Sequence, residues 1–473
     1  MWKCTDLSHY RDMKKDTEVT RAVIVRNEWE AASPERWVAR TSKGLSRRVV
    51  EEISSLKGEP DWMRAKRLQS YDIFLQKQMP TWGVDLSGLC FDDISFFIRP
   101  QDRQFASWDD VPADIKIIYD KLGIPQAERN MLAGLVGQYE SEGFYAKLRE
   151  VWEKKGVIFT DTDTAVKKYP ELVKEYFMTR CVPIADHKFA ALHGAVWSGG
   201  SFVYVPKGVH VDMPLQTYFR MNAPQSGQFE HTIIIAEEGS SVHYIESCTA
   251  PKYSTDSLHS AVVEIFVKKG ASVKYTTIQN WSKNVYNLNT KRAIVEEDGS
   301  VEWVGGSLGS KATMLYPCSW LIGRGARARH LNIATAAAGQ WKDTGAKIIH
   351  GAPYTSSRVI SKSIAMAGGR SSYRGLLKIA KGAHGSKAHV QCDALLLDDK
   401  AQSDTYPSMQ IYEDDVSVMH EATVSRVTDE QLFYLRSRGL TQDQSLDLIL
   451  SGFLDPIAKE LPLDYAIELN RMI

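Results

Sequence analysis

Cys248 is the residue whose surroundings in the sequence best suit it for chemistry. It lies in YIESCTAP, where alternation along a strand puts Tyr244, Glu246 and Cys248 on one face. Pro251 should end this strand, so we expect the sulfur near an edge of the fold. A thiol that is shielded, or whose pKa is lowered, can carry an extra sulfur atom as a persulfide. From composition alone, Cys248 would be a buried structural cysteine.

A second candidate is the pair His420-Glu421 in the segment VSVMHEATV. In a regular strand His420 lies on one face, while Met419 and Glu421 lie on the other, so the pair cannot bind one ion together. Either a bulge turns one side chain round, or the two residues have different roles.

The six cysteines are scattered, and none forms a CxxC or CxxxC motif. This spacing argues against a zinc knuckle, a ferredoxin-type cluster loop and a disulfide framework. Neither GGSLGSKAT (Gly305 to Thr313) nor GAHGSKA (Gly382 to Ala388) has the ending of a phosphate-binding loop. GxSxG and HExxH motifs are also missing. We therefore expect no nucleotide on this chain, and any ATP site would belong to another protein.

The chain of 473 residues carries 58 basic and 58 acidic residues. Because its net charge is zero, no overall field would attract nucleic acid or an anionic membrane. The N-terminus lacks the apolar core of a signal peptide, and no run of about 18 apolar residues could span a bilayer. We expect a cytoplasmic protein without nucleic-acid or membrane partners.

A repeated pattern must position these residues. GSSVHY, GASVKY and GSVEWV begin at Gly239, Gly270 and Gly299, at intervals of 270 − 239 = 31 and 299 − 270 = 29 residues. A fainter copy begins at Gly325, and helix signals are nearly absent from 196 to 425. Such a period, with glycine at the corners, indicates stacked coils of a parallel β-solenoid. A β-sandwich is the weaker alternative.

Helical patterns flank this core on both sides. Residues 1–195 should form a loosely attached arm, up to about residue 43, and a helical domain. A helical hairpin should run from Val49 to Gly58 and from Pro60 to Pro80. Helical spacing continues from Val111 to Ala195 and includes Leu135, Val136 and Tyr139.

Residues 426–473 should form a C-terminal helical domain. Thr428 with Gln431, and Thr441 with Gln444, fit the capping box. A third helix should begin at Asp455-Pro456. The apolar stripe in the second helix either packs on the solenoid or docks a partner, and packing is the commoner need. This stripe contains Leu446, Ile449, Leu450 and Phe453.

Solenoids also occur in carbohydrate-active enzymes, which need clustered carboxylates in a surface groove and often calcium. The candidates Glu246, Glu264 and Glu302 lie in strands whose alternate residues must be core. We keep this class as a weak rival.

Several motifs together carry a family resemblance that runs from about Lys43 almost to Ile473. The chain is identified as a member of the SufB/SufD family and resembles its SufB scaffold subunits, which act in SUF iron-sulfur cluster assembly. The motifs are KGEPDWM (57–63), GSFVYVPKGV (200–209), TYFRMN (217–222), GQFEHT (227–232), YIESCTAP (244–251), QNW (279–281), SYRG (372–375), QCDALL (391–396), HEATVSR (420–426) and DEQLFYLRSRG (429–439).

The resemblance implies a right-handed parallel β-helix between N-terminal and C-terminal helical domains. It implies that the C-terminal helices bind the ATPase SufC and that the β-helix pairs with SufD or a second SufB. Sulfur would come from a cysteine desulfurase or sulfur carrier, and an iron-sulfur cluster would be held transiently. Such a scaffold is not an enzyme by itself. Some SUF complexes also bind a reduced flavin.

The resemblance also assigns residues. Cys248 matches the sulfur-accepting cysteine, and His420 and Glu421 match positions near the subunit interface where a nascent cluster is held. Iron would thus be bound by Cys248, His420 and Glu421. The positions that match a sulfur path are Arg220, Asn222, Gln279, Trp281 and Lys291. Of these, Arg220 and Lys291 would favour a persulfide anion.

The chain departs from the family pattern in three places. Ile411 stands where many SufB proteins have a cysteine, Met419 stands where they have a glutamate, and their acidic, glycine-containing tail is missing after Ile473. Neither side chain is a good iron ligand. A SufD-like partner without its own cluster is the alternative. SufD-like chains usually lack YIESCTAP and QNW together, so the presence of both favours SufB.

Overall fold

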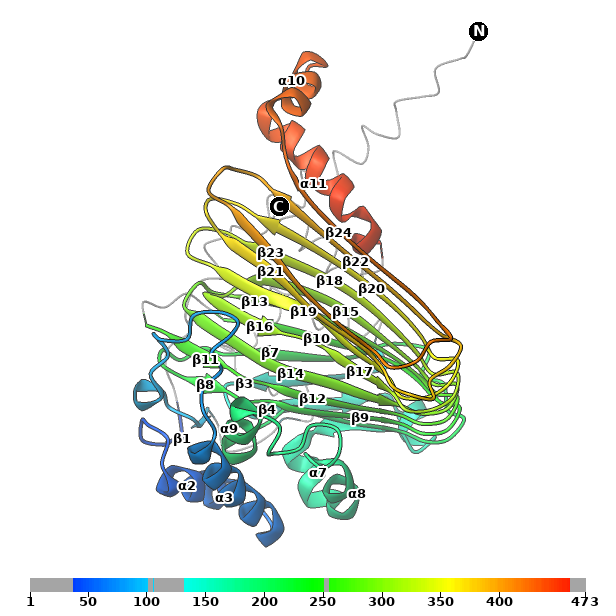
Figure 1. Cartoon of the computed structure of the whole chain (residues 1–473). Helices are drawn as coiled ribbons and strands as arrows, with labels where there is room; N and C mark the ends of the chain where they lie inside the picture. Colours follow the sequence, from blue (N-terminus) through cyan, green and yellow to red (C-terminus); the bar gives the residue numbers. More distant parts are fainter. Residues whose placement is uncertain (1–36, 101–104, 106–131, 251–254, 460–473) are drawn as a thin grey trace.

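The chain winds into a flattened solenoid whose coils form two long sheets that face each other (Figure 1). The computed structural model describes residues 37–100, 105, 132–250 and 255–459. Helices cover the first coils, and a second helical unit lies at the other end. The expected mixed fold with a mainly β core is confirmed.

One sheet has ten strands in the order β24-β22-β20-β18-β15-β13-β10-β7-β3-β4. All its neighbours pair in parallel except β3 and β4. We call this the long sheet. Its strands are β3 (Gly134–Tyr139), β4 (Glu142–Leu148), β7 (Leu215–Arg220), β10 (Ser241–Thr249), β13 (Ser272–Trp281), β15 (Ser300–Gly309), β18 (Arg327–Ala336), β20 (Ser356–Ala365), β22 (Ser386–Leu396) and β24 (Val416–Arg426).

The facing sheet follows the order β23-β21-β19-β16-β14-β12-β9-β6-β5, and β17 also lies between β14 and β19. Its strands are β5 (Ile158–Asp161), β6 (Ser201–Val205), β8 (Gly227–Gln228), β9 (His231–Ala236), β11 (Ser257–His259), β12 (Val262–Val267), β14 (Val285–Val295), β16 (Ala312–Leu315), β17 (Cys318–Leu321), β19 (Trp341–His350), β21 (Arg370–Ile379) and β23 (Gln402–Ile411). A separate small pair joins β1 (Ala39–Arg40) to β2 (Ile98–Arg99).

The sequence repeat is the coil of this solenoid. Ser241 pairs in register with Ser272, and Ser272 with Ser300, so consecutive copies stack directly. Gly239 and Gly270 have φ of 67° and 65°, a left-handed conformation that glycine adopts at little cost. At the third corner Asp298, not the glycine after it, has the positive φ. The parallel solenoid is confirmed, and the sandwich alternative is wrong.

The N-terminal helices cover the first coils. The predicted hairpin is present as α2 (Arg47–Lys57) and α3 (Asp61–Gln76), and Gly58 ends the first helix in a left-handed conformation. A shared apolar cluster joins α2, α3 and α9 to the strands beneath. The remaining helices here are α6 (Glu150–Glu153), α7 (Thr162–Lys168), α8 (Pro170–Tyr176) and α9 (Lys188–Val196), with a 3-10 turn η1 (Phe91–Asp93).

The helix expected around Leu135, Val136 and Tyr139 is wrong. These residues form β3, which pairs with β7 and is buried on both faces. Because a strand buried on both faces shows no alternation, its apolar residues also fit helical spacing. The expected arm spans residues 1 to about 43; residues 1–36 of it lie outside the described residues, and so does the helical pattern over 111–131. Within the described end of the arm, Ala39–Arg40 form strand β1.

A buried carboxylate ties the helical layer to the solenoid. Glu264 on β12 is fully buried, and its two oxygens accept the main-chain N–H groups of Met178 and Val182, each at 2.8 Å. Burial raises the pKa of Glu264 to about 7, although these two hydrogen bonds act in the opposite direction.

Glu264 begins a chain of hydrogen bonds through two buried histidines. Glu264 Oε2 lies 3.0 Å from His231 Nε2, His231 Nδ1 lies 2.9 Å from His193 Nε2, and His193 Nδ1 lies 2.9 Å from the Ser260 carbonyl. Burial lowers the pKa of both imidazoles well below the usual value. Since a carbonyl only accepts, each neutral histidine must donate towards Ser260, and Glu264 must then donate to His231. The raised pKa of Glu264 fits this arrangement.

The C-terminal unit consists of α10 (Asp429–Ser437) and α11 (Gln442–Ala458). Both predicted capping boxes are present, because Thr428 and Gln431 exchange hydrogen bonds and so do Thr441 and Gln444. The third helix expected at Asp455 is wrong, because α11 continues through this point. The helical bond from Lys459 N–H to the Asp455 carbonyl spans the proline.

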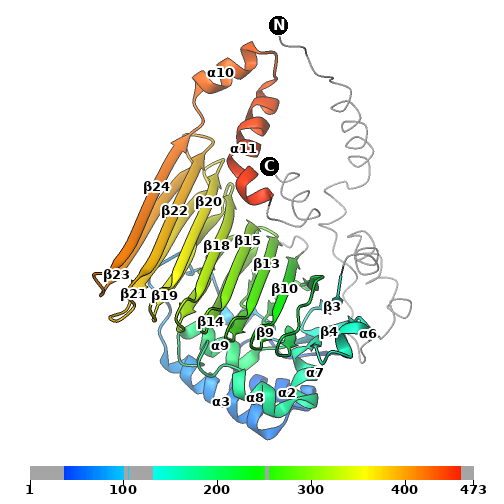
Figure 2. The same ribbon diagram turned by 90° about the vertical axis from the view of Figure 1, so that its right-hand side faces the viewer.

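The apolar stripe of α11 packs on the outer face of the long sheet. Leu450 and Leu454 are buried there, and Leu446, Ile449 and Phe453 are partly buried against the same cluster. Figure 2 shows α11 beside the long sheet, with α10 projecting beyond it. Packing, the commoner interpretation of the stripe, is confirmed. In the described part of the chain, no helix is both long and apolar enough to cross a membrane.

Candidate functional site

Cys248 lies inside the solenoid near the end of β10, with only 1% of its surface exposed. Tyr244 and Glu246 point the same way, as the alternation predicts. Four apolar side chains enclose the sulfur from β7, the turn after it, β13 and β14: Phe219, Met221, Trp281 and Val285. The thiol is therefore shielded from bulk water.

A buried charge network surrounds this thiol. Glu246 Oε1 lies 3.7 Å from Cys248 Sγ and accepts a 3.1 Å hydrogen bond from Lys291 Nζ, which also donates to Tyr275 Oη at 2.7 Å. Burial, followed by the carboxylates of Glu246 and Glu230, raises the pKa of the Cys248 thiol well above its usual value, while Lys291 opposes this shift. At neutral pH the thiol is protonated, and Lys291 forms an ion pair with Glu246 beside it.

The other predicted path residues lie on both faces of the long sheet near Cys248. Gln279 is its register partner on β13, and Arg220 is the register partner of Thr249, to whose hydroxyl it donates at 3.3 Å. Asn222 is also buried and follows two residues after Arg220. Because Thr249 and Cys248 point to opposite faces of β10, Arg220 lies on the outer face, across the long sheet from the sulfur. The structure thus brings Gln279, Trp281 and Lys291 to the sulfur inside the solenoid, but not Arg220.

A buried histidine that sequence reasoning missed joins this region. His259 Nε2 lies 2.9 Å from Glu230 Oε2, and His259 Nδ1 lies 2.8 Å from Asn287 Oδ1. Asn287 in turn donates to Gln279 Oε1 at 2.7 Å, and the His259 ring lies 4.3 Å from the Trp281 ring. These groups come from the facing sheet, so the spacing within one strand could not reveal them. The only signal was Glu230 in the motif GQFEHT.

Several buried polar atoms here have no hydrogen-bond partner within the described chain: Gln279 Nε2, Trp281 Nε1, Glu230 Oε1 and Gln228 Oε1. Leaving such an atom unpaired costs about 1–3 kcal/mol. Two of the four are N–H donors, Gln279 and Trp281, and both lie on β13 beside Cys248. The arrangement is suited to receive a polar or anionic group next to the sulfur.

Two inner rows of the long sheet continue from this region to its last coils. One row is bulky and runs from Tyr244 through Tyr275, Trp303, His330, Val359 and Val390 to His420. The next row is small or polar, and we call it the polar lane: Glu246, Thr277, Gly305, Asn332, Ser361 and Cys392. A Cβ atom added at Gly305 would lie 3.2 Å from Asn332 Oδ1, so the Asn332 side chain lies close to this glycine.

The polar lane ends at a cysteine–histidine pair. Cys392 Sγ lies 3.6 Å from His420 Nε2, and both groups point between the sheets. Burial, followed by Asp393, raises the pKa of Cys392 to about 11, and burial lowers the pKa of His420. A neutral imidazole beside a thiol can bind a soft metal once the thiol loses its proton.

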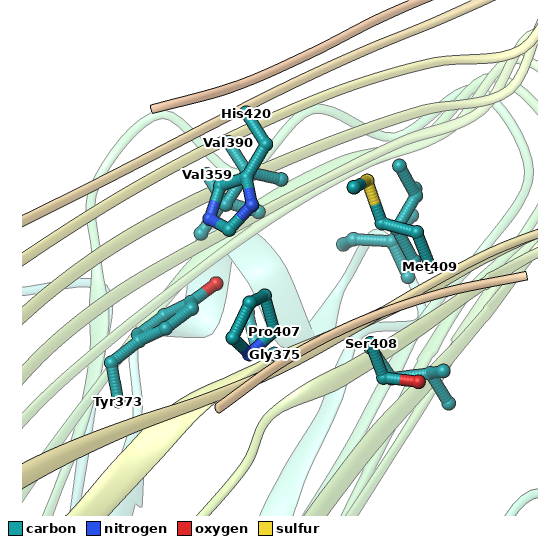
Figure 3. A pocket seen from close by; sticks show the side chains of 12 residues that line it. Val359, Tyr373, Gly375, Val390, Pro407, Ser408, Met409 and His420 are labelled. Atoms are coloured by element: carbon teal, nitrogen blue, oxygen red, sulfur yellow. The ribbon is translucent and has the colours of Figure 1, made fainter. Parts of the chain in front are cut away.

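A small cavity of about 20 Å³ is lined by His420 but not by Cys392. Figure 3 shows His420 on one side, with Tyr373 and Pro407 of the facing sheet opposite and Met409 beside them. The sequence analysis left Cys392 among the scattered cysteines, although QCDALL was one of the family motifs.

Glu421 lies on the other face of β24. Its Oε1 is 3.0 Å from His389 Nε2 on the outer surface, and the register between β22 and β24 contains no bulge. His420 and Glu421 therefore point to opposite faces, as the alternation predicts. Ile411 and Met419, at the two departures from the family pattern, are 43% and 58% exposed.

The predicted iron ligands do not meet within this chain. Six strand spacings of about 4.8 Å separate β10 from β24, so Cys248 lies roughly 29 Å from His420. The described residues contain no group of three or more His, Cys, Asp or Glu side chains that could hold a metal ion.

The carboxylates considered for a carbohydrate-active enzyme are not clustered. Glu246 and Glu264 are buried in separate networks, and Glu302 pairs with Arg329 at 2.7 Å on the outer face. This rival is not favoured.

The structure is thus a parallel solenoid that encloses one cysteine, Cys248, and places a second, Cys392, beside a histidine of the last strand, β24. Residues 219–453 match the SufBD core domain of SUF-system FeS cluster assembly, and residues 136–217 match the SufBD N-terminal region. Curated relatives include iron-sulfur cluster assembly SufBD family proteins of Staphylococcus aureus (strain MRSA252) and Staphylococcus haemolyticus (strain JCSC1435). Each is 53% identical over 436 residues, which is 92% of this chain and 94% of the relative. The chain belongs to the SufBD family.

Proposed function

We propose that this chain is a SufB-type scaffold that accepts sulfur at Cys248 and takes part in cluster assembly at its last coil. The observation that carries the proposal is the polar lane, which joins the enclosed region of Cys248 to the Cys392–His420 pair. A SufD-like role needs neither cysteine nor a polar connection between them.

The sulfur-accepting step is an exchange without net oxidation. The Cys248 thiolate attacks the outer sulfur of a persulfide on a cysteine desulfurase or sulfur carrier, and the donor cysteine leaves as a thiolate. One S–S bond forms as another breaks, and the proton from Cys248 passes to the donor thiolate. Because Cys248 is protonated at rest, it must first lose this proton, and Glu246 at 3.7 Å is the nearest carboxylate that can receive it.

A persulfide on Cys248 would find polar groups already in place. The N–H groups of Gln279 and Trp281 have no partner in the described chain, so an added anionic sulfur gains hydrogen bonds without breaking others. Lys291 offsets part of the negative charge. Converting persulfide sulfur to sulfide consumes two electrons, for which a reduced flavin in the complex is the proposed source.

Partners would bind at the last coil and the helices beyond it. In the described structure β23 and β24 each have one strand neighbour, so their other edges can pair with SufD or a second SufB. Iron would then be held transiently at the Cys392–His420 pair, with further ligands from the partner. Glu421 lies on the outer face of the same strand, where a partner could also reach it.

The ATPase SufC is the proposed partner of the C-terminal helices. Since the stripe on α11 faces the sheet, the contact would use exposed side chains instead: Phe433, Tyr434 and Leu448 are 73%, 57% and 54% exposed. ATP hydrolysis would be supplied by SufC, and this chain would have no enzymatic activity of its own.

The test is a substitution that fills the polar lane with a larger side chain and leaves both cysteines unchanged. Ser361→Leu places a large branched side chain in the row beside Cys392. Ser361→Ala keeps a small side chain at this position and is the matched control. After anaerobic purification with SufC, we expect Ser361→Leu to keep persulfide on Cys248 but to lose iron and acid-labile sulfide. Ser361→Ala should match wild type. Normal iron in the leucine variant would contradict the proposed route, and wild type without persulfide or iron would favour a SufD-like role.

A further inference from the structure

A groove of about 560 Å³ crosses the outer face of the long sheet. It is lined by the first residues of β13, β15, β18, β20, β22 and β24, on the face opposite the polar lane. The later residues of the same strands form the apolar half of this face, on which α11 packs. Among the described residues, no helix packs on this half of the outer surface, so the groove is separate from the surface that α11 covers.

The groove is strongly cationic in a chain whose net charge is zero. Five of its lining residues are lysine or arginine and one is glutamate. The glutamate is Glu302, which pairs with Lys274 at 3.5 Å and with Arg329 at 2.7 Å. Arg327 donates to the Asp298 carbonyl. The two remaining cations are Arg358 and Lys387.

Arg358 and Lys387 are exposed, and they form no ion pair or hydrogen bond with the described chain. Arg358 also lies directly beside Arg329 in the parallel register of β18 and β20. Like charges at neighbouring positions on paired strands are destabilising. An external anion would offset this repulsion, so the pattern points to an occupant with negative charge.

The shape of the groove distinguishes between kinds of anion. It spans five strand spacings of about 4.8 Å, or roughly 24 Å, and its cations are spread along this length. A phosphate site usually gathers main-chain N–H groups around one point, at a helix N-terminus or a glycine-rich turn. In the middle of a sheet these N–H groups are already used by the strand ladders. Carboxylates along an extended peptide match the spacing better, and about seven residues would cross the groove.

We propose that this cationic groove is a docking site for an extended acidic segment of a partner protein. The segment would lie across the strands, with carboxylates on Arg358 and Lys387 and polar groups on the hydroxyls of Ser272, Ser300 and Ser356. Because the groove ends at His389 and Met419, the segment would reach the outer surface of the strands that carry Cys392 and His420. The proposal goes beyond the proposed function and does not depend on sulfur transfer.

The experiment measures binding of a fluorescein-labelled octapeptide of alternating glutamate and serine to the full chain by fluorescence anisotropy. We expect binding that weakens as salt is added. Arg358→Glu with Lys387→Glu should weaken it by about tenfold or more, and Arg358→Gln with Lys387→Gln by less. The matched control, Lys381→Glu with Lys400→Glu, makes the same change in net charge at exposed positions outside the groove and should leave affinity unchanged.

Three results would overturn the proposal. The first is no binding of the acidic peptide to wild type at low salt. The second is equal loss of affinity in the groove and control variants, which would indicate attraction by net charge alone. The third is binding of pyrophosphate that the groove variants abolish while the peptide stays unbound, which would make the ligand a phosphorylated small molecule. Because the substituted side chains are exposed, thermal melting of each variant should match wild type, and the glutamine pair gives a milder test if it does not.

Discussion

The two cysteines that face the solenoid interior lie in opposite settings. Cys248 is enclosed among ionised and aromatic side chains, whereas Cys392 lies on β22 beside His420 of β24, the strand that ends the long sheet in the described structure. Burial and nearby carboxylates raise the pKa of the Cys248 thiol well above the usual value. The pKa of the Cys392 thiol is raised to about 11. The comparison indicates that both thiols are shielded from solvent, but that Cys392 lies one strand from the end of the long sheet, where a partner subunit would bind.

The largest expected effect separates the two cysteines. Cys248→Ser should reduce sulfur loading from a labelled persulfide donor to background, because no thiol remains to attack the donor. Cys392→Ser should leave that loading intact and remove bound iron. Labelled sulfur and iron per chain, measured after anaerobic purification with SufC, check both. If both variants lose sulfur equally, the two sites do not have separate roles.

The stability of the protein should be sensitive to the loss of the positive charge of Lys291 in the enclosed region around Cys248. Lys291→Met leaves Glu246 buried without its cation, which typically costs about 3–5 kcal/mol in the free energy of unfolding. Adding Glu246→Gln to this variant removes the unpaired charge, so the double variant should recover much of the loss. Urea denaturation of the three proteins tests this. A double variant no more stable than Lys291→Met would show that the ion pair is not the cause.

The stability of the contact between the helical layer and the solenoid should depend on pH. The raised pKa of Glu264, about 7, means that its contribution to stability is fully present below its usual pKa of 4.5 and is lost as pH rises through about 7. This shift corresponds to about 3 kcal/mol. Glu264→Gln cannot ionise, so the difference in unfolding free energy between wild type and this variant should fall by that amount from pH 4 to 8. A constant difference would mean that Glu264 ionises normally in the folded protein.

The smallest effect is expected on the outer face of the last strand. Glu421→Gln breaks an exposed contact with His389, and such pairs contribute about 0–1 kcal/mol. Its unfolding midpoint in urea should therefore stay close to that of wild type, in contrast to Lys291→Met. A large loss would show that the outer face of β24 is more tightly coupled to the core than its exposure indicates.

The sequence predicts the solenoid well because the length of its repeat equals the number of residues in one coil. Gln279 follows Cys248 by 279 − 248 = 31 residues, the length of one coil, so the repeat alone places it beside the sulfur. The same step, 392 − 361 = 31, sets Cys392 beside Ser361. The later coils lose their clean glycine spacing, so this second relation was not readable.

Contacts between the two sheets were beyond prediction from sequence patterns. His259 and Lys291 reach the cysteine region from the facing sheet, and no spacing within one strand records which residues of two sheets meet. The family resemblance supplied Lys291 but not His259 or Cys392. Strand β3 was missed for a different reason, because burial on both faces removes the alternation that marks a strand.

In the described structure β23 and β24 each lack a neighbour on one edge, and this affects where the protein opens locally. In a solenoid each coil is held mainly by its neighbours, so an end coil with one neighbour has the lowest local stability. The first coils are covered by α2, α3 and α9, so opening should begin at the other end. Main-chain amides of β24 should exchange with solvent deuterium sooner than those of β13. Pairing of this edge with a second subunit would slow that exchange, so the coil next to Cys392 would become rigid only in the assembled complex.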